Sequence, residues 1–139
     1  MRKIERIFVH CTAGPQSQSI KDLKQEFRRK GWKSPGYHYV VSPNGGTHQL
    51  LPIEQVSNGV QGYNSTAINV AYIGGIDSNG SPVDNRTIAQ KESLVLLLHK
   101  LRLQFPSALI LGHRDIWGDK SKWKKMCPCF NAAEEYKNL

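Results

Sequence analysis

The sequence has no hydrophobic run long enough to cross a membrane. A transmembrane helix needs about 20 consecutive apolar residues, and no stretch of the 139-residue chain approaches that length. The N-terminal segment Met1–Arg6 is basic and leads directly into a strand-like stretch. It lacks the apolar core and small-residue cleavage site of a secretory signal peptide. We therefore expect a protein that is made in the cytoplasm without a signal peptide and has no membrane span.

Cysteine is also scarce, with three residues at positions 11, 127 and 129. An odd number of cysteines without an export signal argues against a disulfide framework. Cys127 and Cys129 are separated only by Pro128, and a disulfide between such close neighbours would be strained. The cysteines are therefore interpreted as free thiols or metal ligands.

Acidic residues are few, since 11 Asp and Glu stand against 19 Lys and Arg and give a formal charge of +8. A basic protein attracts polyanions such as nucleic acid, anionic membranes or anionic cell-wall polymers. The densest basic run, residues 120–125, adjoins Cys127. It is either a solvated loop or a device that steers an anionic substrate. A nucleic-acid-binding zinc protein should carry a basic recognition helix or a paired CxxC motif, so we expect no nucleic-acid partner.

Repeats, low-complexity tracts and linkers are absent as well, which predicts one domain over residues 1–139. We expect this domain to be a monomer. Strand patterns occupy residues 4–11, 37–41, 47–51, 68–73 and 108–111, and helical patterns residues 20–30, 87–104 and 132–137. Ser19 with Asp22, and Thr87 with Gln90, have capping-box spacing. The alternation of elements predicts an α/β fold, with one mixed sheet of about five strands flanked by helices.

Three residues that lie far apart in the chain could form a metal site. His10 ends the first predicted strand, His113 follows the last, and Cys127 lies just beyond it. Ligands commonly bind beyond the strand ends of open sheets. Two imidazoles and one thiolate would provide three ligands of a tetrahedral zinc, with the fourth position open to water. Taken singly, each residue could instead be structural, because no local CxxC or HExxH signature accompanies them.

The remaining cysteine and histidine residues of the predicted strands and helices are expected to have structural roles or to be solvated. Neighbouring strand residues face opposite ways, so Cys11 should point into the core if His10 points to the site. His38 is expected in the core or on the sheet surface. His48 and His99 are expected to be structural or solvated.

The chain resembles the amidase-2 family of N-acetylmuramoyl-L-alanine amidases, which includes phage lysozyme-like enzymes and peptidoglycan recognition proteins. The matching stretches follow the order of the family over nearly the whole chain. They are Ile7-Phe8-Val9-His10-Cys11, Gly31-Trp32, Gly36-Tyr37-His38-Tyr39, Gly62-Tyr63-Asn64, Gly74-Gly75-Ile76-Asp77 and Lys125-Met126-Cys127-Pro128 with Phe130.

The resemblance implies a zinc site and a catalytic pair. The zinc ligands of the family correspond to His10, His113 and Cys127, its active-site tyrosine to Tyr37 and its catalytic lysine to Lys125. A lysine ammonium can stabilise a developing oxyanion, and a tyrosine can orient water or pass a proton. Further candidates for substrate binding are Asn64, in the Gly-Tyr-Asn stretch, and Trp117, which could equally pin its loop.

The implied reaction is zinc-dependent hydrolysis of the amide between the lactyl group of N-acetylmuramic acid and L-alanine in peptidoglycan. A lysis enzyme of a phage or prophage that reaches the wall through a holin pore would fit the missing signal peptide, and so would an effector delivered by a dedicated machine. The alternative is a non-catalytic peptidoglycan-binding module with the same fold.

The sequence departs from the family pattern at two points, and the roles of two further residues stay open. Cys129 stands where phage relatives often have a small polar residue, so it could compete as a ligand; the spacing to Lys125 favours Cys127. Residues 58–60, Asn-Gly-Val, replace a frequent His-Ala pair, which puts details of stem-peptide recognition in doubt. Arg114 and Asp115 could support the metal ligands or form a surface salt bridge.

Overall fold

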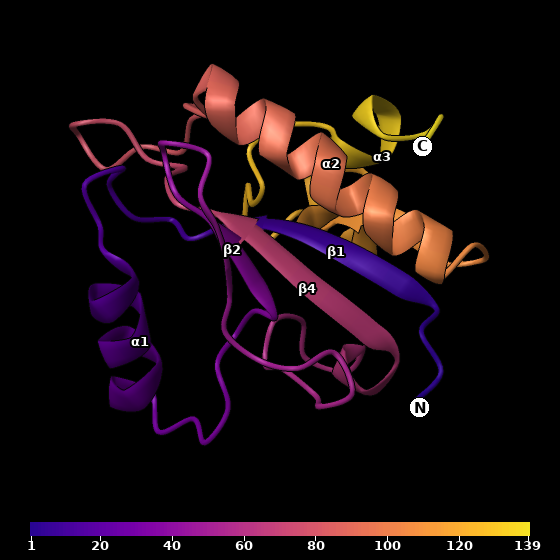
Figure 1. Ribbon diagram of the computed structural model, residues 1–139. Helices are drawn as coiled ribbons and strands as arrows, with labels where there is room; N and C mark the ends of the chain where they lie inside the picture. The colour runs from indigo at the N-terminus through magenta and orange to yellow at the C-terminus, as the bar shows by residue number, and fades with distance from the viewer.

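Five strands form one mixed sheet in the order β3-β2-β4-β1-β5 in a computed structural model that describes residues 1–139 (Figure 1). The strands are β1 (Arg6–Cys11), β2 (Tyr39–Val41), β3 (Thr47–Gln49), β4 (Ala67–Tyr72) and β5 (Leu109–Gly112). β1 lies between β4 and β5 and is parallel to both, β2 is parallel to β4, and only β3 is antiparallel to its neighbour. The carboxyl ends of four strands therefore meet at one edge of the sheet.

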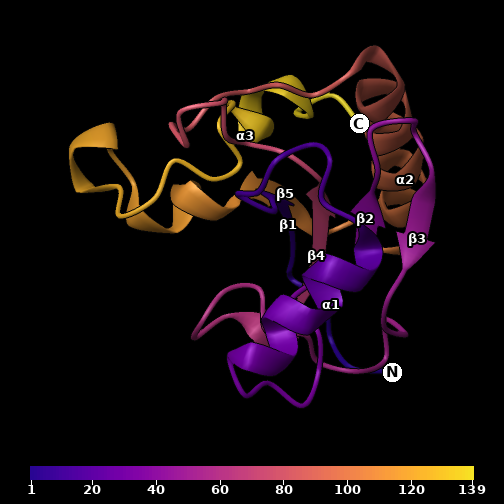
Figure 2. The same cartoon turned by 90° about the vertical axis from the view of Figure 1, so that its left-hand side faces the viewer.

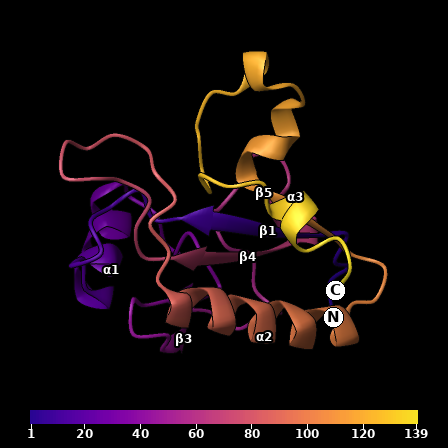
Figure 3. The same ribbon diagram turned by 90° about the horizontal axis from the view of Figure 1, so that it is seen from above.

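Helices cover both faces of this sheet. α1 (Ile20–Arg29) lies on one face, and α2 (Ile88–Gln104) and the short α3 (Ala132–Glu135) lie on the other (Figures 1 and 3). Short 3₁₀ turns are η1 (Asn64–Thr66), η2 (His113–Trp117) and η3 (Lys120–Lys122). The predicted α/β fold is confirmed. None of the helices is both long and apolar enough to span a bilayer.

The two helix starts follow the predicted capping chemistry. Ser19 accepts a hydrogen bond from the Asp22 amide while the Asp22 carboxylate accepts one from the Ser19 amide. Thr87 and Gln90 make the same reciprocal pair at α2. The predicted ends of the other elements differ from the observed ones by only a few residues, which is common at frayed ends.

Gln90 has a second role that its capping position did not predict. Its side chain is fully buried, and Nε2 donates to the carbonyl oxygens of Val41 and Ile73 at 3.1 and 2.9 Å. These carbonyls lie at and beyond the ends of β2 and β4. The first turn of α2 is thereby hydrogen-bonded to the same edge of the sheet at which four strands end.

Side chains of β1 alternate between the two faces of the sheet. Ile7, Val9 and Cys11 belong to the large core under α2 and α3, whereas Phe8 and His10 face the other side. Cys11 is 4% exposed. The prediction that Cys11 packs in the core while its neighbour His10 faces away is confirmed.

An ionic cluster around Arg86 connects the loop after β4 to α3. The Arg86 side chain is only 2% exposed and donates to Asp84 at 2.9 Å and to both carboxylate oxygens of Glu135 at 2.8 and 3.0 Å. Its guanidinium lies 3.4 Å from the centre of the Phe130 ring. These hydrogen bonds from Arg86 hold the pKa of Glu135 below its usual range. The cluster stabilises the segment that follows Cys127.

We expect Glu135→Gln to lower the free energy of unfolding at neutral pH but to leave it nearly unchanged in acid. A carboxylate with a lowered folded-state pKa stabilises the protein above its unfolded pKa of about 4.5, and this contribution disappears as pH falls through the folded value. The carboxylate is partly exposed, so we expect a cost of about 1 kcal/mol at pH 7. Urea denaturation at neutral and acidic pH measures it.

Glu134→Gln is the matched control, because Glu134 pairs with Lys137 only at the exposed surface. Its unfolding free energy should stay close to that of the wild type at both pH values. An equal loss in Glu135→Gln at neutral and acidic pH would contradict the ionic explanation.

Candidate metal centre and its cleft

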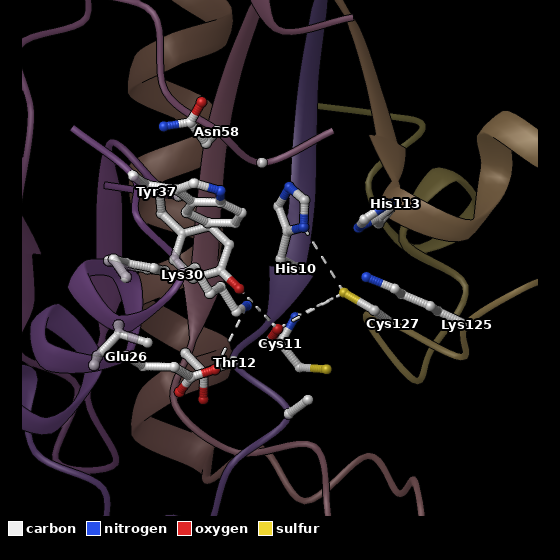
Figure 4. Close-up of a pocket in the computed structure, with 16 residues that line it drawn as sticks. His10, Cys11, Thr12, Glu26, Lys30, Tyr37, Asn58, His113, Lys125 and Cys127 are labelled. Atoms are coloured by element: carbon white, nitrogen blue, oxygen red, sulfur yellow. Dashed lines mark hydrogen bonds and ion pairs between the residues drawn. The ribbon is translucent and has the colours of Figure 1, made fainter. Parts of the chain in front are cut away.

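The three residues expected to bind a metal converge at the carboxyl edge of the sheet. Val9 is paired with Gly112 in the parallel register of β1 and β5, so His10 and His113 lie next to each other as the strands end. Their ring centres are 4.9 Å apart. Cys127 approaches from the following loop, and one ligand atom from each of the three lies within 4.8 Å of the others (Figure 4).

His10 is oriented by Asn69, a buried residue of β4. His10 Nε2 lies 2.8 Å from Asn69 Oδ1. The Asn69 amide is itself fixed, because its Nδ2 donates to Ser57 Oγ at 2.8 Å and to Asn64 Oδ1 at 3.3 Å. His10 therefore carries its proton on Nε2, and the Nδ1 lone pair is left free 3.8 Å from Cys127 Sγ.

Asn69 was not identified from the sequence. The available signal was a single amide residue in the middle of an otherwise apolar strand pattern, Ile68-Asn69-Val70-Ala71. A buried polar group needs hydrogen-bond partners, and here one of them is a candidate metal ligand. Gly59 leaves room for the Asn69 side chain, because a Cβ at position 59 would lie only 2.3 Å from it.

His113 is positioned by ring packing and by the backbone of its loop. Its ring stacks on Trp117 with centres 5.3 Å apart. The Gly112 amide donates to the Asp115 carboxylate at 2.7 Å, and the Arg114 amide donates to the Cys127 carbonyl at 3.1 Å. The last of these bonds joins the two segments that supply His113 and Cys127.

Cys127 lies in a segment that is attached to the core. Its Sγ accepts a hydrogen bond from the Cys11 amide at 3.3 Å. The buried Tyr72 hydroxyl donates to the Pro128 carbonyl at 2.7 Å, and Phe130 packs in the main core. The sulfur is therefore fixed beside the histidines, with a backbone N–H directed at it.

The other two cysteines do not belong to the group of three candidate ligands. Cys129 Sγ is 3.6 Å from the Gly75 carbonyl oxygen and 4.0 Å from Cys11 Sγ. The nearby Cys127 sulfur, followed by burial, raises the pKa of Cys11 to about 12. The hydrogen bond with Cys11, followed by burial, raises the pKa of Cys129. Both side chains therefore remain thiols at neutral pH, and of the Cys-Pro-Cys stretch only Cys127 lies with the histidines.

Burial keeps both histidines neutral. Desolvation is the main cause that lowers the pKa of His10 to about 4, with a smaller contribution from the positive charge of Lys125. Desolvation, then His10 and Lys125, lowers the pKa of His113 to about 3. Neutral imidazoles have the lone pairs that metal binding requires.

Tyr37 and Lys125 flank the cluster on opposite walls of a cavity of about 170 Å³ (Figure 4). The Tyr37 hydroxyl donates to the Cys11 carbonyl at 3.3 Å, and its ring centre is 5.1 Å from that of His10. Burial, followed by the nearby Cys127, raises the pKa of Tyr37 well above its usual value. Tyr37 is therefore a neutral phenol, and Lys125 brings an exposed cation to the facing wall.

A second cavity, of about 460 Å³, adjoins the first. His113 and Lys125 line both cavities. Beyond them, the smaller cavity runs towards α1, and the larger runs towards the 113–126 loop, which projects from the body of the molecule (Figure 2). The candidate centre thus lies at the junction of two arms.

The two predicted substrate-binding residues occupy different places. Trp117 lines the larger arm. Asn64 does not line either arm; its Oδ1 accepts hydrogen bonds from the Val60 amide at 2.7 Å and from Asn69. Asn58 and Gly59, from the 58–60 stretch in which the resemblance leads one to expect a His-Ala pair, line both arms.

The remaining candidates brace the structure around the site. The Arg114 guanidinium lies 4.0 Å from the centre of the Trp123 ring and donates to the Met126 carbonyl. These contacts of Arg114, and the hydrogen bond from the Gly112 amide to Asp115, stabilise the loop. Neither side chain contacts the candidate ligand atoms. His38 was expected either in the core or on the sheet surface, and it is fully buried. Its Nδ1 accepts a hydrogen bond from the backbone amide of Asn69 at 3.0 Å.

Comparisons with known proteins identify a family for this chain. Residues 1–129 match the family model described as N-acetylmuramoyl-L-alanine amidase. An endolysin of Klebsiella phage KP32 is 33% identical over 132 residues, covering 94% of this chain and 83% of that protein.

Solved structures give the same result at the level of the fold. The Ph2119 endolysin of a Thermus scotoductus bacteriophage superposes with a TM-score of 0.73 at 26% identity, covering 92% of this chain and 79% of that one. The bumblebee protein PGRP-SA shares the fold, with a TM-score of 0.75 at 13% identity, covering 100% of this chain and 83% of that one. The chain therefore belongs to the N-acetylmuramoyl-L-alanine amidase family of the amidase-2 type.

Proposed function

We propose that this protein is a zinc-dependent amidase that cleaves peptidoglycan between the lactyl group of N-acetylmuramic acid and L-alanine. The observation that carries the proposal is the His10–His113–Cys127 cluster at the base of a cleft, in a chain of this family. The endolysin relatives support a role in lysis of the cell wall.

The donor set fits zinc. Two neutral imidazoles and one sulfur that accepts a backbone N–H are typical ligands of this ion, and the cleft leaves a side open for substrate. When bound, zinc supplies Lewis-acid activation of water and of the scissile carbonyl. Asn69 fixes the ring of His10 in the tautomer whose Nδ1 lone pair would be free to bind zinc.

Lys125 and Tyr37 supply the remaining chemistry. An amide is difficult to hydrolyse because negative charge develops on its oxygen and its nitrogen is a poor leaving group. The Lys125 ammonium stabilises the oxyanion from one wall of the cleft. From the other wall, the Tyr37 phenol orients the attacking water or passes a proton to the nitrogen.

The two arms of the cleft suit a substrate that extends in both directions from the scissile bond. The larger arm, with Trp117, offers an aromatic surface for the sugar, and the smaller arm offers the charged pair Glu26 and Lys30 to the stem peptide. The formal charge of +8 favours encounter with the anionic wall and should lose its effect as salt rises. A lytic enzyme of a phage or prophage fits these properties.

The decisive experiment combines metal analysis with product analysis for Cys127→Ser. We expect about one zinc per wild-type chain, and new N-terminal L-alanine without new reducing sugar ends. The variant should lose zinc and activity together, and a chelator should inactivate the wild type.

Cys129→Ser is the matched control for this experiment and should keep both properties, because Cys129 lies outside the cluster. Peptidoglycan binding without release of amine, across several peptidoglycan types, would identify a recognition module instead. Absence of zinc from the wild-type protein would reject the proposal.

Removing the two wall residues should slow the reaction while leaving the metal in place. We expect Lys125→Met to lower kcat about 100-fold or more, because an oxyanion-stabilising group is lost, and Tyr37→Phe to lower kcat by a similar factor. Steady-state kinetics and zinc content of each variant measure this. Lys124→Met, a neighbouring change in the larger arm, is the control and should change kcat much less; an equal loss in all three would point to a general charge or folding effect.

Asn69→Leu should weaken zinc binding. The change removes the hydrogen-bond partner of His10 Nε2, and loss of such a partner typically lowers metal affinity about 10- to 100-fold. Competition with a chelator of known affinity measures the loss. Ser57→Ala touches the Asn69 amide but not His10, so its effect should be smaller; equal effects would assign Asn69 a purely structural role.

A further inference from the structure

We propose that Cys11 and Cys129 form a redox-modification site, in which the two thiols are joined as a disulfide when the protein meets an oxidising environment. Their sulfur atoms are 4.0 Å apart, although the residues come from opposite ends of the chain. A disulfide requires about 2.05 Å, so the sulfurs must approach by about half of their present separation.

The surroundings leave room for this bond. Both thiols lie against Gly75: a Cβ at this position would be 2.5 Å from Cys11 Sγ, and the Gly75 carbonyl oxygen is 3.6 Å from Cys129 Sγ. Because Gly75 has no side chain, the space beside the sulfurs stays open. Cys11 is buried, whereas Cys129 is only half-buried, so an oxidant reaches Cys129 first.

Cys127 is a poor alternative partner. Its sulfur is directed at His10 and the Cys11 amide, and it is separated from Cys129 by a single residue, which makes a disulfide between the two strained. Any metal held by the cluster would mask it further. The pairing of Cys11 with Cys129 is therefore the one that the structure favours.

The chemistry balances with a small-molecule disulfide such as oxidised glutathione. The Cys129 thiol gives up its proton as its sulfur attacks one sulfur of the oxidant, whose S–S bond breaks; the departing sulfur takes up a proton and leaves as one thiol. Cys11 then attacks the Cys129 sulfur of the mixed disulfide and releases the second thiol. The two cysteines lose two electrons and two protons, and the oxidant is reduced to two thiols.

The bond would connect the two segments that carry the candidate metal ligands. Cys11 follows His10 directly, and Cys129 is two residues beyond Cys127. The Cys11 backbone already contacts Cys127 Sγ and the Tyr37 hydroxyl. A cross-link between residues 11 and 129 closes most of the chain into a loop, and a long loop gives a large entropic stabilisation in the chain-entropy description. We expect a more stable protein that loses metal more slowly.

The disulfide can form whether or not the protein has the proposed amidase activity. Its benefit to the protein, however, rests on the proposed function. Thiols stay reduced in the cytoplasm and are oxidised outside it. A lytic enzyme that leaves the cytoplasm to reach the wall would therefore gain the cross-link on arrival.

The test treats the full-length, zinc-loaded protein with oxidised glutathione and then alkylates the free thiols after metal removal under denaturing conditions. We expect an intact mass lower by two hydrogens before alkylation, loss of two of the three alkylatable thiols, and Cys127 as the thiol that remains. Peptide mapping should find the Cys11–Cys129 bond. The melting temperature should rise by on the order of 10 °C, and metal transfer to a chelator should slow.

Variants separate this pairing from other outcomes. Cys129→Ser should abolish the mass loss and the thermal shift, whereas Cys127→Ser should keep the mass loss because it leaves the pair intact. Cys11→Ala should behave as Cys129→Ser; if the core change prevents folding, Cys129→Ser carries the comparison alone. Three alkylatable thiols after oxidation, a persistent glutathione adduct at Cys129, or a bond mapped to Cys127 would overturn the proposal. An inactive protein that still forms the bond would instead argue against the amidase proposal.

Discussion

The parallel pairing of β1 with β5 is the constraint on which the site depends. Because Val9 lies opposite Gly112 in this register, the next residues along the two strands, His10 and His113, emerge side by side at the edge of the sheet. A slip of one residue would turn His10 into the core and bring Cys11 to the cleft. The large core beneath α2 prevents that slip, since Ile7, Val9 and Cys11 are all packed in it.

A connected set of buried polar groups supports the site from behind. The Asn69 side chain accepts a hydrogen bond from His10 at Oδ1 and donates one to Ser57 from Nδ2. The Asn69 backbone amide donates to His38 Nδ1. Each buried polar group in this set has a partner, so the set orients His10 without leaving an uncompensated buried donor or acceptor. The orientation of the His10 ring, a candidate metal ligand, is thus set by a residue of the neighbouring strand β4.

The three cysteines show how one residue type takes different roles according to its surroundings. Cys127 accepts a backbone N–H and faces two neutral imidazoles. Cys11 and Cys129 lie together on the core side, where their mutual contact and burial favour the protonated thiol. Cys11 links the two environments, because its backbone contacts Cys127 of the candidate metal centre while its side chain belongs to the thiol pair.

Local patterns in the sequence were sufficient for the elements and for the list of candidate ligands. The capping pairs Ser19–Asp22 and Thr87–Gln90 are contacts between near neighbours, and the alternation of His10 and Cys11 follows from strand geometry, so both could be predicted without the fold. The tertiary structure decided what depends on contacts between distant segments. Asn69 behind His10, the inward amide of Asn64, the Arg86 cluster and the Cys11–Cys129 proximity all join residues from separate elements. The spacing of residues along the chain carries no information about such pairs until strand order and register are known.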